Sequence, residues 1–188
     1  DEIKSRHTKD FNSLFANASL DLGNKESRSI PTDERLIRFK KGEKDNDLIT
    51  TFFQFARYLL ISSSRPGTEA ANLQGLWNRD IQPPWGSNFT NNINTQMNYW
   101  PAEVTNLSDC HQPLFDLIQK LAINGVKTAK INYDANGWMA HHNTDIWGQT
   151  GPTGGFDWDK NTNKPFWSSW PMAGGWLCQH LWTHYEFS

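Results

Sequence analysis

The stretch that most constrains the fold is residues 48–61, where apolar side chains occupy almost every face of a predicted helix. A helix that is apolar all round is buried on all sides, and a soluble chain achieves this only with two layers of helices. We therefore expect an all-α protein in which residues 48–61 are covered on every side. The apolar members are Leu48, Ile49, Phe52, Phe53, Phe55, Ala56, Leu59 and Leu60.

Helical spacing and capping residues predict several further helices, while strand-like alternation is rare and no internal repeat stands out. A bend is expected at Pro101, because proline interrupts helical hydrogen bonding. The expected helices run from about 8 to 15, 32 to 41, 45 or 47 to 61, 95 to 103, 108 or 109 to 133, and 172 to 187.

Two long segments between these helices, 65–91 and 141–170, are rich in aromatic and polar residues. Long loops in a compact domain are usually functional. The chain has ten tryptophans in 188 residues, most of them from Trp77 onward. An indole face covers the C–H face of a sugar ring, while amides and carboxylates bind its hydroxyls. Composition alone supports equally a sugar site and tryptophans that fill gaps between helices.

Charge and hydropathy exclude other classes of function. The formal net charge is -2 and the pI about 6.3, without a basic patch, so nucleic acid is not an expected partner. No apolar run approaches the roughly 18 residues of a membrane helix, so no membrane insertion is expected. The first residues show no signal-peptide pattern. The length fits one domain or a piece of a larger one.

The first candidate for chemistry is the pair Asn92 and Asn94. In an extended segment, residues two apart face the same side, so both amides could point into one cleft. Each amide offers an acceptor oxygen and two donor hydrogens, enough to orient a water molecule. The alternative is that both asparagines form ordinary turn hydrogen bonds.

Histidines form the next candidates. Residues 141–147, with His142 and Asp145 beside a tryptophan, are typical of a sugar-hydroxyl site, although a helix cap or a weak metal site would use the same residues. His180 and His184 are four apart on a helix, but Leu181 stands where a zinc protease needs glutamate. A packed or hydrogen-bonded histidine pair is the better interpretation, and no metal site is predicted.

Acids near the aromatic loops complete the candidates. A glycosidase needs two carboxyl groups, one as acid and one as base or nucleophile. No spacing selects two members of this set, and Glu103 could equally brace a helix. The acids are Glu69, Glu103, Asp145, Asp157 and Asp159.

Long motifs in this chain resemble glycoside hydrolase family 95, over nearly the whole sequence. The motifs are PTDERL (31–36), SSSRPG (62–67), ANLQGLWN (71–78), NINTQMNYWPAE (92–103), HHNTD (141–145), WPM (170–172) and WLCQHLW (176–182). Motifs of this length, in this order, are far more specific than the spacings above.

The resemblance implies an (α/α)6 barrel, here a partial one. Residues 1–45 are expected to form a linker with short helices, and residues 46–188 the first part of the barrel. Flanking β-domains would belong to the same parent chain. The implied partner is a fucosylated glycan or oligosaccharide, no cofactor is expected, and the expected location is secreted or periplasmic.

The resemblance also implies inverting hydrolysis of terminal α-1,2-linked L-fucose by an exo-acting α-L-fucosidase. Asn92 and Asn94 match the asparagines that hold the attacking water in that family. Substrate-binding residues are expected at Trp85, Thr90, His142, Asp145 and Trp170. The general acid glutamate and the partner aspartate are expected after residue 188, so this segment alone should be inactive.

Three alternatives stay open. An α-L-galactosidase of the same family differs only in a hydroxyl at C6 of the sugar, and no residue here decides between the two. A non-catalytic sugar-binding module would use the same tryptophans and asparagines. A purely structural helical domain predicts that these residues line no common pocket. A related family of the same clan uses phosphate in place of water, but no phosphate signature is visible.

Overall fold

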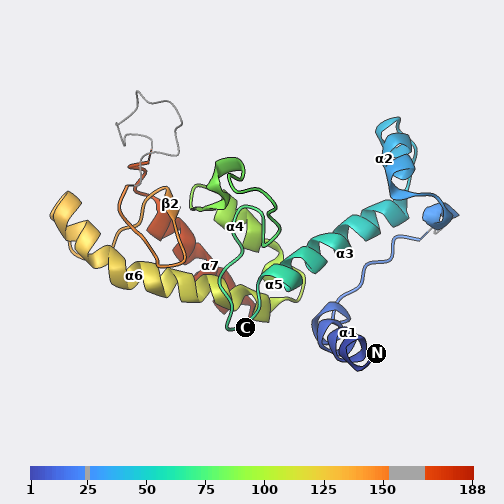
Figure 1. The fold of residues 1–188 in the computed structure, drawn as a ribbon, viewed down its shortest axis with the longest axis horizontal. Helices are drawn as coiled ribbons and strands as arrows, with labels where there is room; N and C mark the ends of the chain where they lie inside the picture. The colour runs from blue at the N-terminus through green and yellow to red at the C-terminus, as the bar shows by residue number, and fades with distance from the viewer. Residues whose placement is uncertain (24–25, 153–167) are drawn as a thin grey trace. The chain divides into compact units, whose positions relative to one another are not determined.

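The computed structural model describes residues 1–23, 26–152 and 168–188, and they form an all-α protein (Figure 1). The helices are α1 (Glu2–Phe15), α2 (Thr32–Lys40), α3 (Asn46–Ser63), α4 (Asn94–Tyr99), α5 (Pro101–Val104), α6 (Gln112–Tyr133) and α7 (Ala173–Phe187). Short 3-10 turns are η1 (Glu26–Ser29), η2 (Pro84–Ser87) and η3 (Ser108–His111), and the two short strands are β1 (Phe89–Thr90) and β2 (Asn143–Thr144).

The described residues divide into two compact units, Asp1–Ile61 and Ser62–Ser188, called here the N-terminal unit and the C-terminal unit. This division falls inside α3. The expected domain boundary after residue 45 concerns the extent of the barrel, and it stays a prediction. Among the described residues, no helix is long and apolar enough to cross a membrane.

The N-terminal unit is held largely by buried charged side chains. Arg57 of α3 is 1% exposed and donates to the backbone carbonyls of Leu14, Phe15 and Ala18 at 2.8–3.1 Å. It therefore ties the end of α1 to α3. The loop before α3 is fixed by buried Arg35, which forms ion pairs with Asp45 at 2.8 Å and Asp47 at 3.1 Å.

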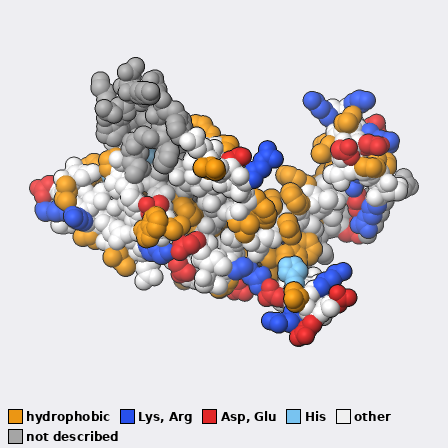
Figure 2. Space-filling view, viewed as in Figure 1, with side chains coloured by type: hydrophobic (Ala, Val, Ile, Leu, Met, Phe, Trp, Pro, Cys, Tyr) orange, Lys and Arg blue, Asp and Glu red, His pale blue; other side chains and the backbone are white. Residues whose placement is uncertain are grey.

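The prediction that residues 48–61 are buried on every side is wrong. The segment is helical as expected, but Phe52 is 73% exposed and Phe55 54% exposed, and Figure 2 shows hydrophobic side chains at the surface along α3. Helical periodicity predicts where a helix forms, but not which other segments cover its faces. Here Asp47 and Arg57 take buried positions, whereas Ile49, Phe52 and Phe55 are exposed.

The core of the C-terminal unit lies along α6. The predicted helical spacing is confirmed, since Leu114, Leu117, Ile118 and Leu121 are all buried. α6 packs against α7, and α7 also packs against α4 and α5. Gly125 lets the segment that follows α6 approach the helix closely, because a Cβ there would lie 2.5 Å from the Met139 carbonyl oxygen.

Candidate functional site

The two long loops meet at the antiparallel pair β1–β2. Phe89 pairs with Thr144, and Thr90 pairs with Asn143. One residue further, the Asn91 N–H donates to the His142 carbonyl at 2.7 Å, and the Asn91 amide donates to the His141 carbonyl at 3.0 Å. The ladder therefore brings Thr90 beside Asn143 and Asn91 beside His142, although 50 residues of sequence separate Asn91 from His141.

Asn92 and Asn94 lie on a tight turn at the start of α4, and not in the extended segment that we expected. Between them Ile93 has a φ of 74°, in the left-handed region, and Asn94 is the first residue of α4. Both asparagines are exposed. Within the described part of the chain their side-chain amides form no hydrogen bond, which leaves them available to a ligand.

Side chains from the first turn of α4 fix this Asn92–Asn94 turn. The Thr95 hydroxyl donates to the Thr90 carbonyl at 2.9 Å. The Gln96 amide donates to the Asn91 carbonyl at 2.7 Å, and both Gln96 and Asn91 are completely buried. The turn is therefore anchored on its N-terminal side to the helix that follows it.

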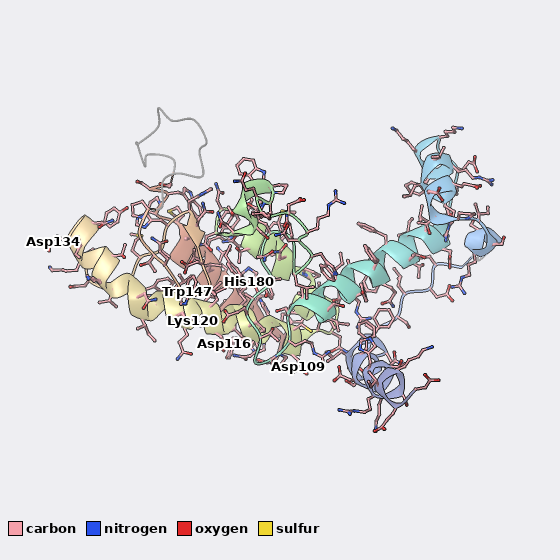
Figure 3. All side chains as sticks on the ribbon, in the orientation of Figure 1. Asp109, Asp116, Lys120, Asp134, Trp147 and His180 are labelled. Atoms are coloured by element: carbon pink, nitrogen blue, oxygen red, sulfur yellow. The ribbon has the colours of Figure 1, made fainter. Side chains whose placement is uncertain are left out.

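The two predicted sugar-binding residues of the second loop, Asp145 and His142, differ in their surroundings. Asp145 is half-buried, and its Oδ1 accepts the backbone N–H groups of Trp147 and Gln149 at 3.0 and 3.1 Å. This carboxylate therefore already shapes its own loop, which runs along α6 beside Lys120 (Figure 3). Burial lowers the pKa of half-buried His142, so its imidazole is neutral at pH 7.

The two predicted sugar-stacking tryptophans differ. Trp85 is 83% exposed and has a left-handed φ of 56° in the turn η2. Its side chain is therefore not buried against any of the other predicted site residues. Trp170 is half-buried and lies edge-on to Trp176 of α7, with ring centroids 6.0 Å apart. Asp157 and Asp159, two of the candidate acids, lie outside the described residues.

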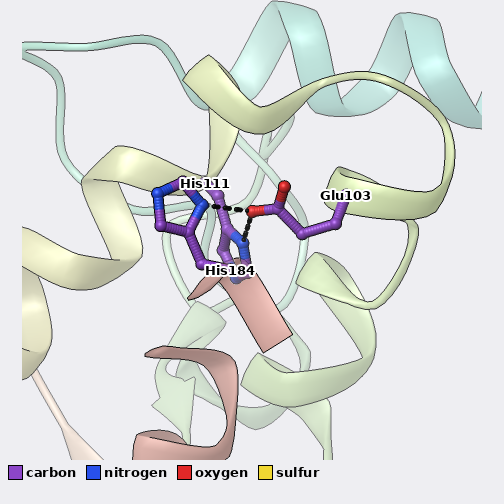
Figure 4. Close-up of side chains that lie close together, drawn as sticks. All are labelled: Glu103, His111 and His184. Carbon is purple, nitrogen blue, oxygen red and sulfur yellow. Dashed lines mark hydrogen bonds and ion pairs between the residues drawn. The ribbon is translucent and has the colours of Figure 1, made fainter. Parts of the chain in front are cut away.

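A largely buried polar cluster connects α5, η3 and α7 (Figure 4). The Glu103 Oε1 atom lies 2.7 Å from His111 Nδ1 and 2.7 Å from His184 Nδ1. The Ser108 hydroxyl donates to the other carboxylate oxygen at 2.5 Å. His111 Nε2 in turn lies 2.9 Å from His180 Nδ1. We call these four residues with Ser108 the Glu103 cluster.

Electrostatics determine the protonation state of this cluster. Burial raises the pKa of Glu103, but hydrogen bonds from Ser108, His111 and His184 outweigh burial and hold the pKa below its ordinary value. The ionised carboxylate can only accept, so the Nδ1 atoms of His111 and His184 carry protons. Burial lowers the pKa of His111 despite Glu103. Burial, with a contribution from His111, lowers the pKa of His180 to about 4.

These states define the direction of the hydrogen bonds. A neutral His111 that donates from Nδ1 accepts at Nε2, so His180 donates from its own Nδ1. A cavity of about 90 Å³ adjoins the cluster. Its lining residues are Tyr99, Trp100, Glu103, His111, Trp176, Gln179, His180 and Thr183.

The cluster also has the composition of a metal site. One ligand atom each from Glu103, His111 and His184 lies within 4.8 Å of the others. The 2.7 Å separations in the structure are those of hydrogen bonds to a carboxylate. As described, both imidazole N–H groups are engaged with Glu103, and an ion would have to displace both protons.

The sequence profile of the Glycosyl hydrolase family 95 catalytic domain matches residues 1–188. The chain belongs to glycoside hydrolase family 95. The resemblance inferred from the motifs is thereby confirmed.

Curated relatives agree with membership of family 95. The chain is 47% identical to Alpha-L-fucosidase 2 of Arabidopsis thaliana over 192 residues, covering 100% of this chain and 22% of the relative. It is 32% identical to Probable alpha-fucosidase A of Aspergillus niger, over 99% of this chain and 23% of that protein. A protein of the same name from Aspergillus oryzae is 31% identical over 80% of this chain and 21% of its own length. The chain thus spans about a fifth of the length of these relatives.

Part of the site in this family 95 chain has no signature in the sequence. Glu103 was one of five candidate acids, but His111 and Ser108 carried no signal, because the members are separated by as many as 81 residues. His180 and His184 are both hydrogen bonded, though to His111 and Glu103 and not to each other. Asn91 and Gln96, which anchor the asparagine turn, were also not predicted.

Proposed function

We propose that the protein containing this chain is an exo-acting, inverting α-L-fucosidase that removes terminal α-1,2-linked L-fucose from a glycan. The observation that carries the proposal is the 47% identity, over the whole chain, to a protein named Alpha-L-fucosidase 2. The exposed asparagine turn at the start of α4 supports it, because its amides are free of partners within the described residues.

In this proposal Asn92 and Asn94 hold the attacking water. Two amide oxygens can accept the hydrogens of one water and aim its lone pair at the sugar carbon. A carboxylate elsewhere in the parent protein would take the proton, and a carboxylic acid would protonate the leaving oxygen. We propose that both lie outside residues 1–188, with flanking β-domains in the same parent chain.

The remaining predicted residues would bind the sugar. Trp170 offers a half-buried ring face, Thr90 and His142 lie at successive positions of the β1–β2 pairing, and Asp145 has one oxygen that is not used by its own loop. Trp85 is exposed and could reach a sugar only from the rim of a site. A neutral His142 suits hydroxyl groups, which carry no charge. Secretion or a periplasmic location stays a prediction.

The test uses the full-length protein and two matched glycosides. We expect release of L-fucose from an α-1,2-fucosyl disaccharide, with the β-anomer appearing first in a proton NMR time course. The matched α-L-galactoside, which adds only the C6 hydroxyl, should turn over more slowly. Faster galactoside hydrolysis would support the α-L-galactosidase, and binding without hydrolysis would support the sugar-binding module. Initial release of the α-anomer would reject inversion.

A further inference from the structure

We infer that Glu103 is a positioning residue for the catalytic step: through His111 it fixes α4 and the Asn92–Asn94 turn, without itself contacting the substrate. This inference rests on the proposed function, because it deals with the water-holding role of the two asparagines. From the sequence, Glu103 is one of five candidate acids or a helix brace, and no link between it and the Asn92–Asn94 turn is predicted.

The first step runs from Glu103 to His111. Both side chains are buried, and the 2.7 Å bond between Glu103 Oε1 and His111 Nδ1 pairs an ionised acceptor with an imidazole N–H. Hydrogen bonds to a charged partner are about twice as strong as neutral ones. This bond therefore holds the ring plane of His111 in one orientation.

The second step runs from His111 to α4. Its ring lies parallel to that of Tyr99, the last residue of α4, with centroids 5.6 Å apart and an interplanar angle of 11°. Tyr99 is itself fixed, since its hydroxyl accepts the Ala71 N–H at 2.7 Å and bonds the Ser64 hydroxyl at 2.7 Å. A shift of His111 would therefore unstack its ring from Tyr99 or displace Tyr99, which is only 1% exposed.

The third step runs along α4 to the asparagines. α4 is only six residues long, so a displacement at Tyr99 is transmitted as a rigid-body movement to Thr95 and Gln96. These two side chains hold the carbonyls of Thr90 and Asn91, directly before Asn92. Movement of α4 would therefore change the position of both amides relative to the sugar.

A second anchor comes from α7. His184 donates to the same Glu103 oxygen at 2.7 Å, and His180 donates to His111, so one carboxylate joins α7 to α5 and η3. α7 also packs directly on α4. Glu103 thus accepts hydrogen bonds from both η3 and α7. This shared carboxylate holds α7 in one position relative to α5 and η3.

The closing experiment compares Glu103→Gln with Glu186→Gln in the full-length protein. Glutamine keeps the volume of Glu103 but removes its charge and one acceptor oxygen. Glu186 is an exposed glutamate of the same unit that accepts a hydrogen bond from Trp182 Nε1, so it is a matched control. We expect kcat to fall about tenfold or more in Glu103→Gln with KM within about twofold, since a shift near 1 Å can lower a rate about a hundredfold. Glu186→Gln should match the wild type.

A double mutant shows whether Glu103 acts through the turn. If it does, Glu103→Gln should lower kcat much less in an Asn94→Ala background than in the wild type, because the two effects are coupled. A purely structural role predicts a lower melting temperature with unchanged kcat of the folded protein, and equal effects in both backgrounds. Either result would overturn the inference, and so would a rise in KM that matches the loss in kcat.

His184→Ala keeps the test decisive if Glu103→Gln does not fold. The His184 side chain is 38% exposed, so its truncation leaves a smaller defect while removing one link to Glu103. The same split between kcat and KM is expected, and an unchanged kcat would reject the inference. An inactive wild type would reject the proposed function and this inference with it. An active wild type with normal variants would reject the inference alone.

Discussion

Two residues that share a motif, Asn92 and Asn94, are exposed, whereas their neighbours Asn91 and Gln96 are buried. Asn91 and Gln96 are buried and uncharged, which indicates that they anchor the turn. The amides of Asn92 and Asn94 are exposed and have no partner among the described residues, so they are suited to bind a ligand. The sequence alone suggested that Asn92 and Asn94 face one way in an extended chain. The left-handed φ of Ile93 produces a turn instead. The alternation of side chains along an extended segment could not predict this turn.

Asn94→Ala in the full-length protein tests the water-holding role. Because the amide would act only in the transition state, kcat should fall about a hundredfold while KM changes little. Initial-rate kinetics on an α-1,2-fucosyl disaccharide measure both constants. Asn98→Ala, in the same helix but bonded to the Ala71 and Asn72 carbonyls, is the comparison variant. An Asn94 variant with wild-type kcat would contradict the role.

Trp170→Ala should behave differently from the asparagine variants. A lost stacking face weakens binding of substrate and transition state alike, so KM should rise most while kcat is largely kept. The expected rise is about tenfold, since an aromatic contact contributes roughly 1 kcal/mol beyond its buried area. Kinetics on the same disaccharide give the answer, and a loss confined to kcat would exclude stacking.

At the scale of helices, sequence patterns predicted most boundaries. α2, α3 and α6 end within a few residues of their expected limits, and the bend at Pro101 appears as the junction of α4 and α5. α1 begins earlier than expected, at Glu2, because its first turns are polar and carry no apolar periodicity that would predict a helix. What periodicity could not predict is which helix faces meet. The exposed face of α3 and the Glu103 cluster both depend on contacts between distant segments.

The docking of α1 on α3 gives a prediction at this scale. Arg57→Leu should release α1, because the carbonyls of Leu14, Phe15 and Ala18 lose a buried charged donor. An unpaired buried polar group costs about 1–3 kcal/mol. Hydrogen exchange of α1 amides should therefore accelerate at least tenfold, while α6 exchanges as before. Arg38→Leu, on exposed α2, is the control. Unchanged α1 exchange would disprove the anchoring.

For the molecule as a whole, acid should be destabilising through the Glu103 cluster. The folded-state pKa values of His111 and His180 lie below 6.5, so the unfolded chain binds more protons as pH falls from about 6.5 toward 4. Stability from these groups is therefore present above pH 6.5 and is lost below it, by at most about 1.4 kcal/mol per pH unit and proton. Thermal melts from pH 7.5 to 4.5 should show this, and His180→Gln should flatten the slope. A slope unaffected by His180→Gln would contradict the assignment.

Ile93 connects this architecture to its evolution. A β-branched residue with φ near 74° is strained, by an amount on the order of 1–3 kcal/mol for such conformations. Glycine at position 93 would relieve that strain, so mutants selected only for thermostability should accumulate it early. The same substitution would make the adjacent amides of Asn92 and Asn94 more mobile. Selection for turnover should therefore restore a β-branched side chain at this position. Position 93 is thus where adaptation to heat and adaptation to speed pull in opposite directions.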